Sequence, residues 1–231
     1  KVQFHWDRDE PYNDTGSCWV RVGQVWAGQG WGTMFIPRIG HEVLVDFIEG
    51  DPDRPVVVGR LYTGNNKPPY PLPAEKTKST IKSESSLGGG GFNEFRYEDL
   101  KGREEIFLHA QKDWNTFVIN CLTETVGNNR TSSIGSNETI SVGANRTTSV
   151  GANDTTSVGA NSTTSVGANA TLSVAANLTE SVGAMHTMTV AATQSISAGA
   201  TQSVSAGASQ SLSAGTSQSL SAGTSQSLSA G

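Results

Sequence analysis

Residues 142–173 read VGANRTTS VGANDTTS VGANSTTS VGANATLS, which is one eight-residue unit repeated four times. The same unit runs from Val126 to the last residue of the chain, and its first position changes from Val to Ala at Ala198. A fixed period over many copies is the signature of a repeat architecture. A flexible linker rich in Ser, Thr and Gly has no reason to keep such a register, so the repeat predicts regular structure.

The period of eight excludes a helix and fits a β-strand. A helix with 3.6 residues per turn would spread the repeated Val positions around its axis, and Gly and Thr are poor helix formers. Eight is a multiple of the two-residue alternation of a strand, so every repeat keeps the same two faces. The Gly-Ala-Asn group predicts a corner in each unit, because Gly and Asn tolerate backbone angles that other residues avoid. Strand and corner in succession predict a β-solenoid.

The inward residues of such a solenoid are too small to give a single chain a core. One parity carries mainly Val, Ala and Thr, and no aromatic residue follows Phe117. We therefore predict an all-β homotrimer in which three chains intertwine as a triple-stranded β-helix, each octad forming one face of a triangular prism. The predicted core residues of this needle are Val126, Ile134, Val142, Val150, Val158, Val166, Val174, Val182, Val190, Ile196, Val204, Leu212, Leu220 and Leu228.

The composition of the inward parity changes along the needle. Where the first position shrinks to Ala, the position two residues earlier grows from Thr to Ile, Val or Leu, which keeps the packed volume of a layer nearly constant. Near the start of the needle the same parity carries Arg130, Glu138, Arg146 and Asp154, which need water or mutual pairing. The sequence thus predicts a polar base that grades into an apolar, charge-free shaft suited to entering a membrane.

Residues 1–62 contain five strand-like runs between turn-rich pieces, which predicts a small closed β-barrel of the OB type. The runs are KVQFHW, CWVRVGQV, GTMFI, EVLVDFIE and PVVVGRLY, and the fourth is apolar on both faces, as a central strand would be. The proline-rich residues 67–73 predict a stiff, extended connector. Further strands are expected in NEFRYED, EEIFLHA and NTFVINCL. The predicted domains are an OB barrel (1–72), a connector with the start of the prism (73–125) and the needle (126–231).

No group of residues has the spacing of a catalytic, cofactor-binding or metal site. The carboxylates from Asp46 to Asp53 could in principle form an acid/base pair, but a turn at Asp51-Pro52-Asp53 explains them more simply. His41-Glu42 lacks the second histidine of a zinc motif, and glycines 88–91 lack the Lys-Ser or Lys-Thr of a phosphate loop. The four histidines lie in unrelated segments: His5, His41, His109 and His186. We expect a protein that is not an enzyme and that needs no cofactor.

The composition limits which kinds of partner and which compartments suit the protein. The net charge of −5, without a basic patch, argues against nucleic acid. Cys18 and Cys121 lie far apart in different contexts, which predicts two reduced thiols and folding in a reducing compartment. No apolar run has the length of a transmembrane helix. The Asn-x-Thr sequons all fall at one octad position, so the repeat accounts for them without glycosylation.

Long segments of the chain resemble the VgrG proteins, the spike components of bacterial type VI secretion systems. GWGTMFIPRIGHEVLVDFIEGDPDRPVVVGRLY resembles the barrel of that family, and GGGGFNEFRYEDLKGREEIFLHAQKDW resembles the segment that follows the barrel. The octads resemble the needle that VgrG shares with the central spike of contractile phage tails. The resemblance extends over all 231 residues.

The resemblance implies a cell-puncturing homotrimer that caps a contractile tube and delivers effectors into a target cell. The implied partners are an Hcp-type tube below a base domain, a PAAR-type tip protein and effectors at the distal end, and, transiently, the target-cell membrane. Such a protein would assemble in the bacterial cytoplasm and then leave through the type VI apparatus. The family's large base domain and a distinct C-terminal effector segment have no counterpart here, so we expect a fragment.

Two other classes of protein remain open. The first is a trimeric adhesin or phage tailspike-like stalk that displays a carbohydrate-binding module, since OB barrels often bind oligosaccharides. Trp19, Trp26 and Trp31 could contact sugar rings or pack between copies of the barrel, and we favour packing. The second is an enzyme on a stalk, which would need an inserted catalytic domain. The connector at residues 67–75 is too short to hold one.

Overall fold

The computed structural model describes residues 1–8, 13, 15–225 and 227. The chain divides into two compact units, Lys1–Glu138 and Thr139–Gly231, each of which is considered separately. Leu228, predicted as a core residue of the needle, lies outside the described residues. Across the described ranges, no helix has the length and apolar character that a membrane crossing requires.

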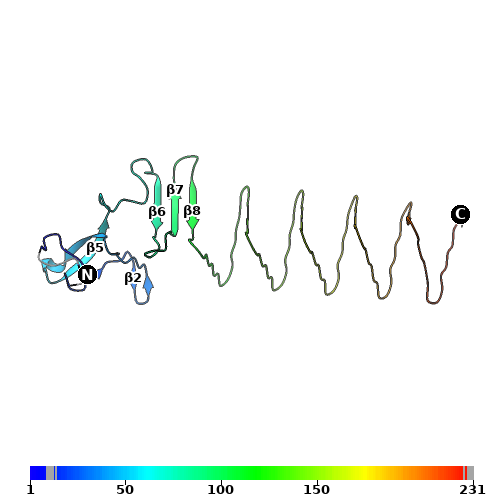
Figure 1. Cartoon of the computed structure of the whole chain (residues 1–231), viewed down its shortest axis with the longest axis horizontal. Helices are drawn as coiled ribbons and strands as arrows, with labels where there is room; N and C mark the ends of the chain where they lie inside the picture. Colours follow the sequence, from blue (N-terminus) through cyan, green and yellow to red (C-terminus); the bar gives the residue numbers. More distant parts are fainter. Residues whose placement is uncertain (9–12, 14, 226, 228–231) are drawn as a thin grey trace. The chain divides into compact units, whose positions relative to one another are not determined.

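Unit 1 begins with a three-stranded sheet in the order β1-β5-β4 (Figure 1). The strands are β1 (Arg21–Val22), β4 (Glu42–Phe47) and β5 (Pro55–Leu61). The central β5 pairs in parallel with β1 and in antiparallel fashion with β4. The runs predicted at EVLVDFIE and PVVVGRLY are therefore strands, but β4 lies at an edge, so the prediction of a central position was wrong.

The two faces of β4 differ in burial, which explains the error. Val43, Val45 and Phe47 are partly covered, whereas Leu44 on the other face is 45% exposed. The second face is thus only partly covered by the residues that the structure describes. On the central strand, Val57 is only 3% exposed, and it is the one buried hydrophobic residue among those that the structure describes. Unit 1 contains hardly any core of its own.

A short hairpin accompanies this sheet. It pairs β2 (Ala27–Gly28) with β3 (Trp31–Gly32), and Gly30 in the intervening turn has a φ of 80°, which favours glycine. The piece AGQGW, expected only as a turn, is therefore the hairpin itself, and the strand expected in GTMFI reaches no further than Gly32. The run KVQFHW forms no strand; its rings Phe4 and Trp6 instead stack with centroids 4.6 Å apart.

A second three-stranded sheet, here called the collar sheet, follows the connector. It is antiparallel in the order β6-β7-β8, with β6 (Lys78–Lys82), β7 (Glu94–Glu98) and β8 (Glu105–His109). β7 and β8 confirm two predicted runs, whereas β6 was not predicted. The connector is not extended throughout, because the N–H of Glu75 bonds the carbonyl of Pro71 at 3.0 Å and forms a turn before β6.

Beyond the collar sheet the chain consists of extended segments separated by bends. The bends recur every eight residues, from residues 111–112 to residues 223–224, and Figure 1 shows the regular zigzag that they produce within unit 2. The first two bends, at 111–112 and 119–120, precede the first Val-Gly pair of the repeat. The eight-residue geometry therefore begins within the segment that the sequence assigned to the start of the prism.

The bends lie where the sequence predicted corners, but the physical reason given for them was wrong. Among the described residues, no residue after Gly102 has a positive φ. The corner glycines and asparagines therefore do not use the left-handed region of backbone space. Two bends carry Ala175 and Ala191 in place of glycine and keep the same local geometry.

Candidate trimerisation surface

One face of the collar sheet carries a buried polar network. The alternation of β7 places Glu94, Arg96 and Glu98 on this face, and the two carboxylates are only 5% and 7% exposed. The hydroxyl of Tyr70, from the connector, donates to Glu94 Oε1 at 2.6 Å, and Thr80 Oγ1 donates to the same oxygen at 2.8 Å. The connector is thereby fixed to the middle of the sheet.

Arg96 joins strands β7 and β8 of the collar sheet to the connector. Its guanidinium donates to Glu105 on β8 at 2.8 Å and to the Tyr70 hydroxyl at 2.7 Å, and it lies 3.8 Å from Glu94. The guanidinium carbon is 4.3 Å from the centre of the Phe107 ring, a favourable cation–π distance. Planar, multiple donors make Arg suited to this role in a way that Lys is not.

The network holds its two buried carboxyls in the ionised form. Burial opposes the ionisation of Glu94, but hydrogen bonds from Tyr70 and Thr80, with the charges of Lys82 and Arg96, outweigh it and lower its pKa. The pKa of Glu98 is lowered chiefly by a hydrogen bond from Thr77, followed by one from the backbone of Leu100. The lowered pKa values predict that the collar sheet loses stability in acid.

Sequence reasoning missed this network because its members are scattered among ordinary strand and linker residues. One signal was present: the run EFRYE alternates charged and aromatic residues, so a strand there must carry two glutamates and an arginine on one face. Tyr70 lies within a proline-rich stretch, and its contact with β7 depends on the turn that follows it.

The opposite face of the collar sheet is apolar and uncovered. Exposed fractions on this face are 60% for Ile81, 66% for Ile106, 50% for Leu108 and 40% for Tyr97. A contiguous apolar face left bare by its own chain indicates an interaction surface. The last strand that carries this face, β8, is followed at residues 111–112 by the first of the eight-residue bends.

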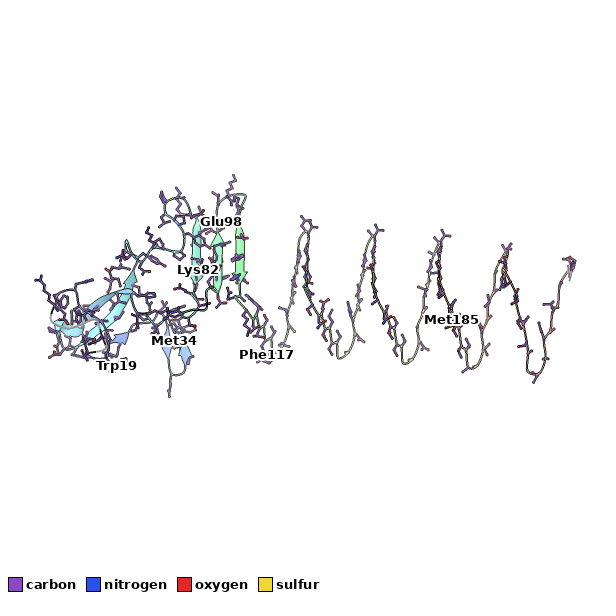
Figure 2. The ribbon with its side chains drawn as sticks, viewed as in Figure 1. Trp19, Met34, Lys82, Glu98, Phe117 and Met185 are labelled. Carbon is purple, nitrogen blue, oxygen red and sulfur yellow. The ribbon has the colours of Figure 1, made fainter. Side chains whose placement is uncertain are left out.

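The octads are likewise uncovered in the single chain. The predicted core residues within the described range are between 43% (Val174) and 72% (Leu212) exposed, and Figure 2 shows the side chains near Met185 with no other segment packed over them. Across the described residues after His109, no backbone N–H donates to a backbone carbonyl of the same chain. Which octad residues face inward stays a prediction.

The residues considered for chemistry have local structural contacts. Asp51 Oδ1 accepts a hydrogen bond from the N–H of Asp53 at 3.0 Å, which confirms the turn predicted there, and Glu49 pairs with Arg54 at 2.9 Å. The ring of His109 bonds the carbonyl of Phe92 at 3.0 Å. In the part of the chain that the structure describes, no three potential metal ligands come together.

Comparison with known protein families identifies the domain type of the N-terminal region and that of the collar sheet with its octads. Residues 1–62 match the family described as the type VI secretion system/phage-baseplate injector OB domain, and residues 79–190 match the bacteriophage T4 gp5 C-terminal trimerisation domain. The second match begins in the collar sheet and includes the octads as far as Val190. The OB and trimeric β-helix predictions are thereby confirmed as fold classes, and both matched families are domains of phage tail-like injectors.

Sequence relatives agree. The chain is 54% identical over 133 residues to the type VI secretion system spike protein VgrG1b of Pseudomonas aeruginosa, which is 57% of this chain and 18% of that protein. It is 48% identical over 130 residues to VgrG3 of Vibrio cholerae serotype O1, covering 56% of this chain and 13% of that protein. The matched segment thus spans a fifth or less of these relatives. Together with the two family matches, these relatives support an assignment to the VgrG family of type VI secretion spike proteins.

Proposed function

We propose that this chain forms the barrel and needle of a cell-puncturing spike, which acts mechanically and without turnover. The observation that carries the proposal is the octad segment, which bends regularly every eight residues although its backbone groups are unpaired within the chain. Buried backbone groups are almost always paired, so a buried needle of this kind takes its partners from another chain. A match to a trimerisation domain over residues 79–190 supports two further copies as those partners.

The mechanical properties follow from interchain pairing. If neighbouring strands of the prism come from different chains, the ladder of backbone hydrogen bonds runs between subunits, and bending must break many bonds together. Each octad then advances the needle by one strand spacing, roughly 4.8 Å, so the octads span about 60 Å. Intertwining also pairs the edges of the strands with neighbouring chains, which limits aggregation through unpaired edges.

The partners and the cellular route are part of the proposal. We infer that the trimer stands on a contractile tube of Hcp type, carries a PAAR-type tip and effectors at its distal end, and contacts the target membrane briefly. The family relation supports this assignment. On this proposal the protein assembles in the bacterial cytoplasm and is then secreted through the type VI apparatus.

Native mass spectrometry tests the assembly directly. The expected result is a mass of three times 24.2 kDa, together with a circular dichroism spectrum dominated by β-structure. A stable, folded monomer would contradict the proposal. Negative-stain electron microscopy of the same sample should show a narrow extension of about 60 Å, the length that the strand spacing requires.

A second function, display of a carbohydrate-binding barrel on a stalk, is favoured only by the exposure of indole rings. Trp19 is 84% exposed and Trp26 is 61% exposed in the single chain. Glycan-array binding that is lost in a Trp19→Ala trimer would support this second function. Binding to no glycan, with a trimer that dissociates on the same substitution, would assign the indole to packing between copies.

A further inference from the structure

A recurring contact across the corners of the octads shows how their side chains point. Taking the register residue, such as Val126, as position 1, each bend lies at positions 2 and 3. Arg130 Nε lies 3.2 Å from Glu124 Oε1, and His186 Nε2 lies 3.7 Å from Glu180 Oε1. Gln194 Nε2 donates to Met188 Sδ at 2.9 Å. All three contacts join position 7 of one octad to position 5 of the next.

The geometry of these contacts identifies the concave side of the corner. Two side chains that flank a bend, six residues apart, converge on the concave side and diverge on the convex side. Because three chemically different pairs meet in this way, positions 5 and 7 lie on the concave side wherever the contact is seen. In a chain that winds around an axis, the concave side faces that axis.

Position 5 carries alternating charge in four successive octads. Its occupants are Arg130, Glu138, Arg146 and Asp154, and the later octads carry uncharged residues or His186 there. Arg130 pairs with Glu124 within its own chain, whereas Glu138, Arg146 and Asp154 form no ion pair with any residue that the structure describes. Charges that face an axis are costly unless water or an opposite charge reaches them, and the alternation of sign from octad to octad favours an opposite charge on another copy.

We propose that these residues form interchain ion-pair ladders that fix the register of the three chains, with Arg130 of one copy beside Glu138 of the next and Arg146 beside Asp154. The proposal rests on the intertwined trimer of the proposed function. In that trimer, the strand stacked on an octad is the following octad of a neighbouring chain, running parallel to it. Equal positions are then about 4.8 Å apart, within reach of an ion pair.

The repeat itself creates the need for such a device. Octads that are nearly identical pair equally well after a shift of one unit, because every Val and Gly then meets another Val or Gly. A shift of one octad in one chain brings Arg130 beside Arg146 and Glu138 beside Asp154. Like charges in adjacent layers penalise that arrangement, so the ladder selects the correct register by repulsion as well as attraction. The three equal charges within each layer are offset by opposite charges in the adjacent layers.

An exchange of two residues tests the ladder at constant composition and net charge. In the double variant E138R/R146E, the introduced arginine lies beside Arg130 and the introduced glutamate lies beside Asp154, so both proposed pairs become repulsive. In the fourfold variant R130E/E138R/R146D/D154R, every sign is reversed and both pairs stay attractive. Trimer melting is followed by circular dichroism at low and at high salt, with native mass spectrometry of each variant.

The expected result is that E138R/R146E melts more than about 5 °C below the wild type at low salt, and that salt narrows the difference. The fourfold variant should regain most of the melting temperature that the double variant loses. It should not regain all of it, because R130E removes the ion pair with Glu124. Equal melting of the double variant and the wild type would overturn the ladder, as would equal losses in both variants. If the double variant does not assemble, assembly of the fourfold variant supports the ladder and its failure refutes it. A wild-type trimer in these runs separates failure of the ladder from failure of the proposed function.

Discussion

Replacing Leu212 by Asp tests the assignment of inner and outer faces in the distal needle. Leu212 occupies position 7, the position that contacts position 5 across a corner at Glu124, Glu180 and Met188. It is 72% exposed in the single chain, so nearly three quarters of the residue's surface is available for burial by the other two copies. At 1.5 to 3 kcal/mol for a fully buried Leu, each copy loses about 1 to 2 kcal/mol of stabilisation on substitution, or about 3 to 6 kcal/mol per layer.

The substitution also places three carboxylates near the axis. Because these charges are unpaired, they add a penalty of several kcal/mol. Ser211→Asp is the matched control, since it places the same carboxylate one residue away on the opposite parity. Thermal unfolding of the trimer, followed by circular dichroism and native mass spectrometry, should show a large loss for Leu212→Asp and little change for Ser211→Asp. Equal effects, or a larger effect of Ser211→Asp, would show that the faces are assigned the wrong way round.

Three further outcomes are expected. Because the pKa values of Glu94 and Glu98 are lowered on folding, their contribution to stability is present above the ordinary pKa of 4.5 and is lost as the pH falls through the lowered value. Melting should therefore fall on acidification below pH 4.5, and less steeply in an E94Q/E98Q variant. Arg96→Met should cost about 2 to 3 kcal/mol in chemical unfolding because it removes charged hydrogen bonds from a buried site, while Arg103→Met, at an exposed position, should cost little. Purified trimer should release no soluble fragments from isolated peptidoglycan, and lysis would refute the expectation that the chain is not an enzyme.

The periodic part of the fold was predictable from sequence because each repeat carries, within eight residues, the pattern that determines its own structure. A strict period of eight determines both the parity of the faces and the place of every corner, and the observed bends at 143–144 and 151–152 lie at the predicted places. The first two bends were not assigned as octads because Gln111 and Ile119 replace the glycine there. Geometry that is imposed by neighbouring repeats can continue into residues that do not carry the repeat signature.

The contacts of unit 1 were less predictable because they depend on residues far apart in sequence. Apolar residues on both faces of β4 indicated a strand between two others, but an edge strand has the same composition when a second copy covers its outer face. The polar network of the collar sheet depends on Tyr70 reaching across 24 residues to Glu94. No local pattern encodes that contact, and only the alternation within EFRYE indicated which residues would share its face.

The corner glycines indicate how close the partner chains must lie. In the described octads, a Cβ added at glycines such as Gly143 or Gly151 would meet no atom of the same chain within 4 Å, and no corner glycine has a positive φ. Neither backbone conformation nor intrachain packing therefore explains why glycine recurs, and Ala175 and Ala191 show that one extra methyl group can be accommodated at some corners. What remains is space for another chain, since glycine permits the close approach of a second backbone. The same residues that make a lone octad segment poor in core are thus the ones that allow three segments to wind tightly together.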